Sequence, residues 1–458
     1  MATDPSLTPR RMSEQPELDR LAAAVFGAWH QAGIHFLVLR NYEELPHFTA
    51  NDVDVLVGPA QLRAAEAALL AAASAAGFRL HNRCEFAATL ALYLSGVQSK
   101  AQAHFDLFTG LRWRGLDFLD GRALLERRVD RGLFAVPHPA HEAAANLLEN
   151  LVYHGKVKDK YRSSIATGFR AEPAEALELL GRTWGVGHAQ FLVAAAAAEN
   201  WTAIEGRTRA LRRALILRQE ARRPCRSAAS LLAEAARFAR RAARPAGLTV
   251  ALCGADGSGK STAARALIEA LRPTFSPQNG RQFHWKPPLF SAKRRAERGP
   301  TTSPHAAPPR NRLVSLFFFG FHWLEFFLGW PLCAKPATFR GGLVLIDRFY
   351  YDFFVDQRRY RLRVPRGLVE LGYRFLAKPD LVLLLDAPVE VLQSRKQEVP
   401  PAETQRQRMA YLELVRGLAN SRIIDAAQPP ERVAAQIERV ILDFLAQRAS
   451  RRGRIEGS

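Results

Sequence analysis

One nine-residue stretch of the chain, Gly254–Thr262, has the residue types that bind phosphate. It reads GADGSGKST, and its three glycines let the backbone curl until successive N–H groups point inward at an anion. Lys260 supplies a cation to the β and γ phosphates of a nucleotide, and Ser261 supplies a hydroxyl group to Mg²⁺. All nine residues are therefore candidate nucleotide contacts: Gly254, Ala255, Asp256, Gly257, Ser258, Gly259, Lys260, Ser261 and Thr262.

The segments on either side of this stretch are those that a phosphate-binding loop requires. Gly247–Cys253 (GLTVALC) is an apolar run that predicts a buried strand, and Thr262–Leu271 predicts a helix. A helix that begins directly after the loop directs its N-terminal dipole at the bound anion. Strand, loop and helix together predict ATP and Mg²⁺ as cofactors, with Lys260 as a catalytic cation and Ser261 as a metal ligand.

Two further apolar runs predict buried strands, and each ends in an acidic residue. Gly342–Ile346 is followed by Asp347 and Arg348, and Leu381–Leu385 is followed by Asp386. Because ligands of open parallel sheets bind beyond the carboxyl ends of the strands, these side chains are expected on the same rim as the loop. The alternative is that these residues serve only as helix caps or turn residues. We favour this alternative for Asp386 but not for Asp347 and Arg348.

Taken as whole motifs, GADGSGKST, LIDRFYYD and KPDLVLLLDAPVEVLQSRK resemble the thymidylate kinase family of P-loop phosphotransferases. The resemblance covers about residues 247–445, and Asp256 inside the loop is a particular mark of that family. It implies that Asp256 approaches the acceptor or the metal ion, and that Asp347 and Arg348 lie at the phosphoryl acceptor. It also implies a lid whose arginines neutralise charge on the transferring phosphoryl group: Arg395, Arg406 and Arg408.

The chain departs from the family in the helix that precedes the Asp-Arg strand. Family members carry an arginine there that grips the nucleoside monophosphate, and counting back from Asp347 gives Phe326 instead. Together with FHWKPP and RFYYDFFVDQRRYRL, this helix resembles a divergent thymidylate kinase-like group that tends to occur with envelope-polysaccharide genes. Five side chains would then shape a non-nucleotide acceptor site, or else form a solvated amphipathic helix: Asp352, Asp356, Arg358, Arg359 and Tyr360.

The aromatic segment Leu313–Cys333 is long and apolar enough to be mistaken for a membrane span. Its middle contains His322 and Glu325, and a charged side chain at the centre of a bilayer is costly. We therefore expect a core or substrate-lining helix. Membrane contact is the alternative.

A second group of carboxylates lies near the N-terminus. Asp52 and Asp54 are two residues apart in a predicted strand and point to one face, and a later strand brings Asp106. Carboxylates that converge without partners repel, and two Mg²⁺ ions would resolve that repulsion in an in-line phosphoryl displacement. The sequence predicts these three side chains as metal ligands. Two solvent-facing aspartates on an edge strand are the alternative.

The surrounding motifs, HFLVLRNYEELP, NDVDVLV and HFDLF, resemble the nucleotidyltransferase fold over about residues 18–134. That family has Gly-Ser or Gly-Gly on the turn after the first strand, where the nucleoside triphosphate docks. Arg40 and Asn41 replace the glycine turn in this chain. This pattern fits an active nucleotidyltransferase. It also fits a fold that is retained only for acceptor binding or for structure.

Charge and composition restrict the partners. The 458 residues carry a net charge of +21, which favours anionic partners. Residues 207–246 contain 12 arginines and 2 acids. This segment is either an ordinary basic surface or one that contacts an anionic membrane. Nucleic acid is the least favoured partner, because no recognised nucleic-acid module is present. The four cysteines form no CxxC pair, so we expect no zinc site. The N-terminus is polar, so we expect no signal peptide and a cytoplasmic location.

These inferences define an α/β protein with a C-terminal P-loop parallel sheet flanked by helices, an N-terminal nucleotidyltransferase-like domain and an all-helical middle. The expected boundaries are residues 1–135, 136–245, 246–447 and a basic tail at 448–458. The expected function is ATP- and Mg²⁺-dependent phosphoryl transfer to a sugar or glycolipid in envelope polysaccharide metabolism. The alternatives are a thymidylate kinase and a non-catalytic ATP-binding assembly protein. We also expect peripheral contact with the inner face of an anionic membrane, and a homodimer.

Overall fold

The computed structural model describes residues 16–43, 45–46, 52–86, 88–99, 101–222, 224–272, 274–275, 277–287, 289, 305 and 307–456. The chain divides into two compact units. One comprises residues 1–240 with 449–458, and the other comprises residues 241–448. The sequence of residues 278–310 is rich in Pro, Arg and Ser, which predicts a long surface loop. About half of this segment, and the end of the basic tail, lie outside the described residues.

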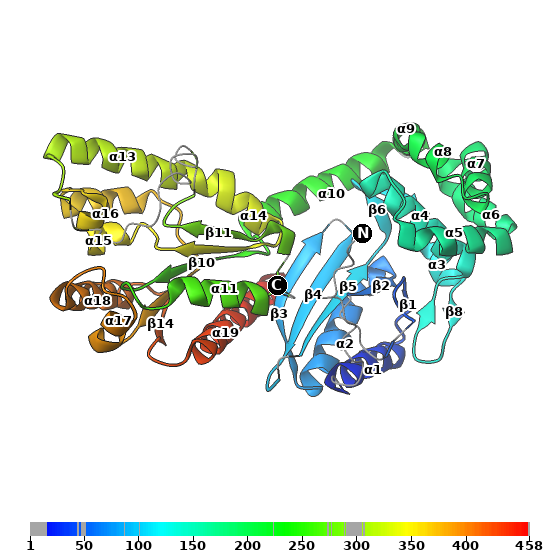
Figure 1. The fold of residues 1–458 in the computed structure, drawn as a ribbon. Coiled ribbons are helices and arrows are strands. Elements are labelled where there is room, and N and C mark those ends of the chain that lie inside the picture. Colours follow the sequence, from blue (N-terminus) through cyan, green and yellow to red (C-terminus); the bar gives the residue numbers. More distant parts are fainter. Residues whose placement is uncertain are drawn as a thin grey trace, which may run out of the picture. The chain divides into compact units, whose positions relative to one another are not determined.

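The first unit contains a five-stranded mixed sheet in the order β1-β2-β5-β4-β3 (Figure 1). These strands are β1 (Phe36–Val38), β2 (Val53–Val57), β3 (Phe78–Phe86), β4 (Thr89–Gly96) and β5 (Gln102–Phe108). β2 and β5 are parallel, and their register pairs Asp54 with Asp106. Helices α1 (Pro16–Gln31) and α2 (Leu62–Ala75) pack on the sheet, and Trp29 donates its indole N–H to the carbonyl of Ala65 at 2.8 Å.

The remainder of the first unit is mainly helical, as expected from its Ala- and Leu-rich sequence. The helices are α3 (Gly121–Glu126), α4 (Pro139–Glu149), α5 (Asp159–Ala171), α6 (Pro173–Trp184), α7 (Val186–Ala197), α8 (Trp201–Gly206), α9 (Thr208–Arg222) and α10 (Pro224–Ala243). Two short hairpins precede α4: β6 (Leu111–Trp113) with β7 (Leu116–Leu119), and β8 (Val129–Asp130) with β9 (Ala135–Val136). A π-helical turn, Asn150–His154, follows α4.

The second unit is built on a fully parallel five-stranded sheet in the order β11-β12-β10-β13-β14. The strands are β10 (Leu248–Cys253), β11 (Arg281–His284), β12 (Leu343–Asp347), β13 (Leu381–Asp386) and β14 (Ser421–Asp425). The two central strands β10 and β12 are buried along their whole length, which explains their continuous apolar runs. The predicted parallel sheet is therefore confirmed.

Helices cover both faces of this sheet (Figure 1). They are α11 (Lys260–Ala270), α13 (Arg312–Gly329), α14 (Lys335–Phe339), α15 (Asp352–Val355), α16 (Arg366–Arg374), α17 (Val389–Arg395), α18 (Pro401–Arg416) and α19 (Pro430–Glu456). An aromatic core lies between one face and α13, α15, α16 and α18, and an aliphatic core lies between the other face and α11 and α19.

One helical stretch of the described chain, Arg312–Phe339, is long and apolar enough to cross a membrane by length and composition. It comprises α13, a π-helical turn at Trp330–Ala334 and α14. Only 28% of its most apolar window is buried. The inner side of α13 nevertheless packs into the aromatic core through Phe319 and Phe326, as expected of a core-lining helix.

Candidate functional site

The loop after β10 has the backbone shape that its glycines predict. Gly254, Gly257 and Gly259 all have positive φ, at 142°, 81° and 83°. A Cβ atom on Gly254 would lie 2.5 Å from the carbonyl oxygen of Leu385, and one on Gly257 would lie 2.4 Å from that of Leu392. Both positions therefore require glycine, and the loop is held tightly between β13 and α17.

Lys260 begins α11 and turns back over the loop. Its Nζ donates to the carbonyl oxygens of Gly254 and Ala255, both at 2.9 Å, and to Ser258 Oγ at 3.2 Å. Burial, followed by the nearby positive charge of Arg348, lowers the pKa of Lys260. The ammonium group thus lies in the hollow of the loop, where phosphate oxygens are the natural partners of a desolvated cation.

Asp347, at the end of β12, completes this part of the site. Its Oδ2 lies 3.4 Å from Ser261 Oγ and 3.3 Å from His284 Nδ1, while its Oδ1 is buried without a hydrogen-bond partner among the described residues. Burial raises the pKa of this carboxyl, but the bond to His284 and the charges of Lys260 and Arg348 more than offset it, so the pKa is lowered. An ionised carboxylate oxygen beside a serine hydroxyl is a donor set that suits Mg²⁺.

Asp256, the acidic residue inside the loop, lies between two arginines. It accepts hydrogen bonds from Arg348 and from Arg359, which also contacts Glu398 at 3.3 Å. Burial raises the pKa of Asp256, but the charges of Arg348, Lys260 and Arg359 overcome this effect and lower it. The loop is therefore tied by charge to the segment that follows β12.

That segment is not a solvated amphipathic helix. Asp352 is fully buried and accepts hydrogen bonds from Arg348 at 3.2 Å, Tyr360 at 2.7 Å and Tyr411 at 2.6 Å. Asp356 is buried too, and Arg359 turns inward to the loop, whereas Arg358 is exposed. Four of the five predicted side chains thus have side-chain partners inside the unit, which removes the solvated alternative for them, and their role at an acceptor stays a prediction.

The three arginines expected on a lid have other partners in this structure. Arg395 ends α17 and donates to the carbonyl of Ala426 at 2.7 Å, and Arg406 pairs with Glu403. Arg408 forms a two-point ion pair with Asp386 at 2.7 and 2.9 Å. The latter two lie within α18 rather than on a loop, because 401–416 forms a continuous helix. Their expected role at the transferring phosphoryl group stays a prediction.

The acceptor side of the loop is less apolar than the sequence indicates. Phe326 is buried against aromatic neighbours at the position where the family arginine is expected. A cation reaches the same region from the end of β11, however: Lys286 is 4% exposed and pairs with the fully buried Glu325, and it donates to His322 at 2.7 Å. Burial, followed by the charge of Lys286, lowers the pKa of His322 to about 3, so the ring is neutral.

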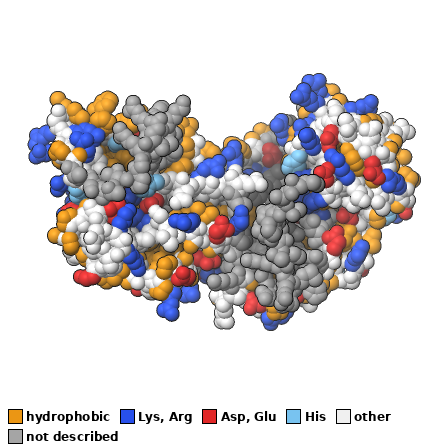
Figure 2. Space-filling view, viewed as in Figure 1, with side chains coloured by type: hydrophobic (Ala, Val, Ile, Leu, Met, Phe, Trp, Pro, Cys, Tyr) orange, Lys and Arg blue, Asp and Glu red, His pale blue; other side chains and the backbone are white. Residues whose placement is uncertain are grey.

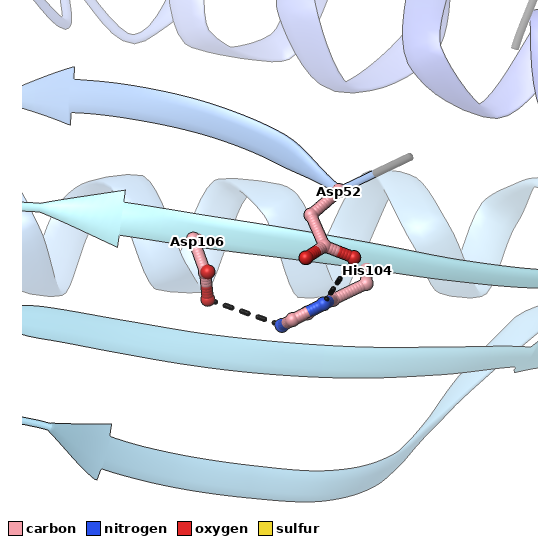
Figure 3. Close-up of side chains that lie close together, drawn as sticks. All are labelled: Asp52, His104 and Asp106. Atoms are coloured by element: carbon pink, nitrogen blue, oxygen red, sulfur yellow. Dashed lines mark ion pairs between the residues drawn. The ribbon is translucent and has the colours of Figure 1, made fainter. Parts of the chain in front are cut away.

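In the N-terminal sheet, Asp52 and Asp106 converge on a histidine rather than on each other (Figure 3). His104 Nδ1 lies 2.7 Å from Asp52, and His104 Nε2 lies 3.1 Å from Asp106. Burial opposes protonation of this ring, but its bonds to the two carboxylates prevail and raise the pKa of His104 to about 10. Tyr93 stacks on the ring with centroids 4.0 Å apart. These three side chains are close enough to hold one metal ion.

Asp54, the third predicted ligand, is paired with Arg40. Arg40 Nε lies 2.5 Å from Asp54, and its Nη1 lies 2.5 Å from Glu149 at the end of α4. Burial raises the pKa of Asp54 to about 6 against the opposing charge of Arg40, and nearby Asp106 and Glu149 add to the rise. The premise that the aspartates lack partners is wrong, because two basic side chains already balance them.

Sequence reasoning missed several of these partners. His104 was open to discovery, because it lies two residues before Asp106 and shares its face of β5. His284 closes a short strand that the sequence left inside an expected loop, and Glu149 is 109 positions from Arg40. No local pattern links such distant residues.

Comparisons with known proteins find relatives over part of the chain. A probable thymidylate kinase of Thermococcus kodakarensis is 34% identical over 121 residues, a match that covers 25% of this chain and 58% of that relative. Thymidylate kinases of Xanthomonas oryzae and Ruegeria pomeroyi are 25% and 29% identical, over 45% and 43% of this chain and 88% and 96% of theirs. No family model matches the chain.

Among solved structures, the thymidylate kinase of Ehrlichia chaffeensis aligns with a TM-score of 0.33 and 16% identity, over 43% of this chain and 98% of that one. The sequence similarity and the geometry of the loop agree on the kind of protein. Over about 45% of its length, the chain is homologous to thymidylate kinases and has a kinase-like, nucleotide-binding core.

Proposed function

We propose that this protein is an ATP- and Mg²⁺-dependent phosphotransferase that acts on a non-nucleotide acceptor, a sugar or a glycolipid, in envelope polysaccharide metabolism. The observation that carries the proposal is the wall of the acceptor region. Phe326 occupies the position of the family's phosphate-gripping arginine, and Lys286 is already neutralised by Glu325. A phosphomonoester dianion therefore finds no uncompensated cation on this helix, whereas a neutral hydroxyl acceptor needs none.

The residues of the loop have distinct roles in this reaction. Backbone N–H groups of Gly254–Ser261 and the ammonium group of Lys260 hold the phosphates of ATP. Ser261 and Asp347 would hold Mg²⁺, which neutralises charge on the β and γ phosphates when bound. Arg348, which is held by ion pairs with Asp256 and Asp352, would meet the acceptor oxygen and balance the transferring charge.

Thymidylate phosphorylation is the second candidate, because the curated relatives carry that name. The two candidates differ in their acceptor and not in the nucleotide loop. We expect labelled ATP to transfer phosphate to sugars or envelope lipid extracts and only poorly to thymidylate. Efficient conversion of thymidylate to its diphosphate would reject the non-nucleotide acceptor. A third candidate, a non-catalytic ATP-binding assembly protein, predicts no transfer to any acceptor.

For the N-terminal sheet we propose a nucleotidyltransferase fold that has lost efficient transfer. The support is Arg40, which stands where that family has its glycine turn and which pairs with Asp54. We further propose a cytoplasmic location for the whole chain.

A further inference from the structure

The outer side of α13 presents an apolar stripe to solvent. Leu313, Phe317, Leu324 and Phe327 are 80%, 71%, 40% and 43% exposed. Their spacing of four, seven and three residues places them on one side of a helix. Large apolar residues exposed singly are common on protein surfaces, but a continuous stripe marks an interaction site.

The same helix is anchored on its inner side. Glu325 is fully buried and paired with Lys286, and Phe319 and Phe326 are buried in the aromatic core. Spanning a bilayer would remove the helix from this core and strand a charged pair in hydrocarbon. The stripe is therefore a surface of the folded unit.

The neighbouring helix α16 extends this surface. Trp323 of α13 donates its indole N–H to the carbonyl of Gly372 at 2.9 Å, and its ring contacts Phe327 in a stacked arrangement. On α16, Leu371 and the residue that follows the helix, Phe375, are 49% and 64% exposed. Figure 2 shows hydrophobic side chains gathered where α13 and α16 lie, with basic side chains at the outer end of α13.

Charge around the stripe distinguishes between its occupants. The exposed basic residues on or next to these helices include Arg312, Lys335, Arg340, Arg366, Arg374 and Lys378. Of the acids on the two helices, Glu325 is buried and Glu370 is paired with Arg366 at 3.0 Å. A second copy packed through the same face would bring two sets of cations together, whereas an anionic lipid surface complements them.

We propose that the α13–α16 face docks the protein on an anionic bilayer, with its apolar stripe at the headgroup–acyl boundary and its basic residues among the lipid phosphates. Exposed aromatic and leucine side chains with surrounding lysine and arginine have the composition of interfacial membrane anchors. The inner side of α13 lines the acceptor region, so docking would bring a lipid-linked acceptor to the loop; only this last step rests on the proposed function.

Vesicle flotation of the full-length protein tests the docking. We expect binding to vesicles of phosphatidylcholine with phosphatidylglycerol and weak binding to phosphatidylcholine alone. The double variant Phe317→Ser/Phe327→Ser should bind at least tenfold more weakly, because each ring loses its apolar contact with the acyl region. Val186→Ser, which changes a residue 69% exposed on α7, is the matched control and should bind like the wild type.

Charge variants test the second half of the proposal. Arg312→Gln/Arg374→Gln should reduce the preference for anionic vesicles by about fivefold per cation and leave binding to neutral vesicles unchanged. Unaltered flotation of the Phe317→Ser/Phe327→Ser variant would assign membrane contact to another segment, such as the arginine-rich α9–α10, and overturn the proposal. Light scattering tests the remaining possibility. If the wild type is a dimer that does not bind vesicles, and the Phe317→Ser/Phe327→Ser variant is a monomer, the face is assigned to a second copy.

Extraction from membranes distinguishes docking from a spanning helix, and activity measurements show whether docking is independent of the kinase assignment. Alkaline carbonate should release the protein from membranes, and release by detergent alone would show a spanning helix instead. The Phe317→Ser/Phe327→Ser variant should keep its ATP turnover with a water-soluble acceptor, and Lys260→Ala should keep its vesicle binding. Failure of the kinase assignment would therefore leave the flotation results intact, and loss of flotation would leave the kinase assignment intact.

Discussion

Lys260 is the residue whose removal should affect chemistry without affecting the fold. Its contacts are two loop carbonyls and one hydroxyl, so the Lys260→Ala variant loses a cation and little packing. We expect ATP turnover to fall by at least about 100-fold with an unchanged melting temperature. Lys160→Ala, at an exposed lysine of α5, is the control. Full turnover in the Lys260→Ala variant would contradict the kinase assignment.

The ion pairs of Asp256 predict a pH dependence of stability. Because its pKa is lower in the folded protein than in the unfolded chain, its contribution to stability is complete above its ordinary pKa and is lost progressively as the pH falls from that value toward the lowered pKa of the folded protein. Asp256→Asn should cost about 3 kcal/mol at neutral pH, since Arg348 and Arg359 each lose a buried partner.

Urea unfolding at neutral pH and between about pH 4 and 3 measures this effect. The wild type and the Asp256→Asn variant should converge as the pH falls. The exposed pair on α16 provides the control, because Glu370→Gln should change stability by less than about 0.5 kcal/mol at either pH. A constant gap between wild type and Asp256→Asn would show that the carboxylate is not ionised in the fold.

At the scale of elements, the parallel pair β2 and β5 determines whether the first unit binds metal. We expect millimolar Mn²⁺ to raise the melting temperature of the nucleotide-free protein, and Asp106→Asn to remove the rise, because Asp106 lies with Asp52 and His104 in a cluster that is close enough to hold one metal ion. Ser261→Ala controls for metal at the loop. A melting temperature that does not change with Mn²⁺ concentration would show that the first unit has no metal site.

At the scale of the whole molecule, the two compact units should respond separately to nucleotide. If MgATP binds the loop of residues 241–448 as proposed, it should raise the temperature of one calorimetric transition and leave the other unchanged. Lys260→Ala should weaken that shift. A single transition that moves as a whole would show that the units unfold together.

Local sequence signals were sufficient to predict the nucleotide loop and the elements around it. The strands expected at 247–253, 342–346 and 381–385 occur at 248–253, 343–347 and 381–386, because continuous apolar runs and glycine spacing are local signals. The edge strands β3, β11 and β14 escaped prediction, since edge and half-polar strands lack such runs. The apolar run of β4 was also missed. The strand at 52–57 alternates in polarity yet is buried from Val53 to Val57, because its valines pack in one core, Leu56 packs in another and Asp54 is paired with Arg40.

Only the tertiary structure decided which charges meet. Asp256 is bound by arginines 92 and 103 positions away, and Lys286 reaches Glu325 across 39 positions. A buried charge requires a partner, but sequence spacing within one element cannot name a partner on another element. The same reason explains why Asp54 is balanced by Arg40 and Asp52 by His104, since each of these basic partners lies outside the strand that carries the aspartate.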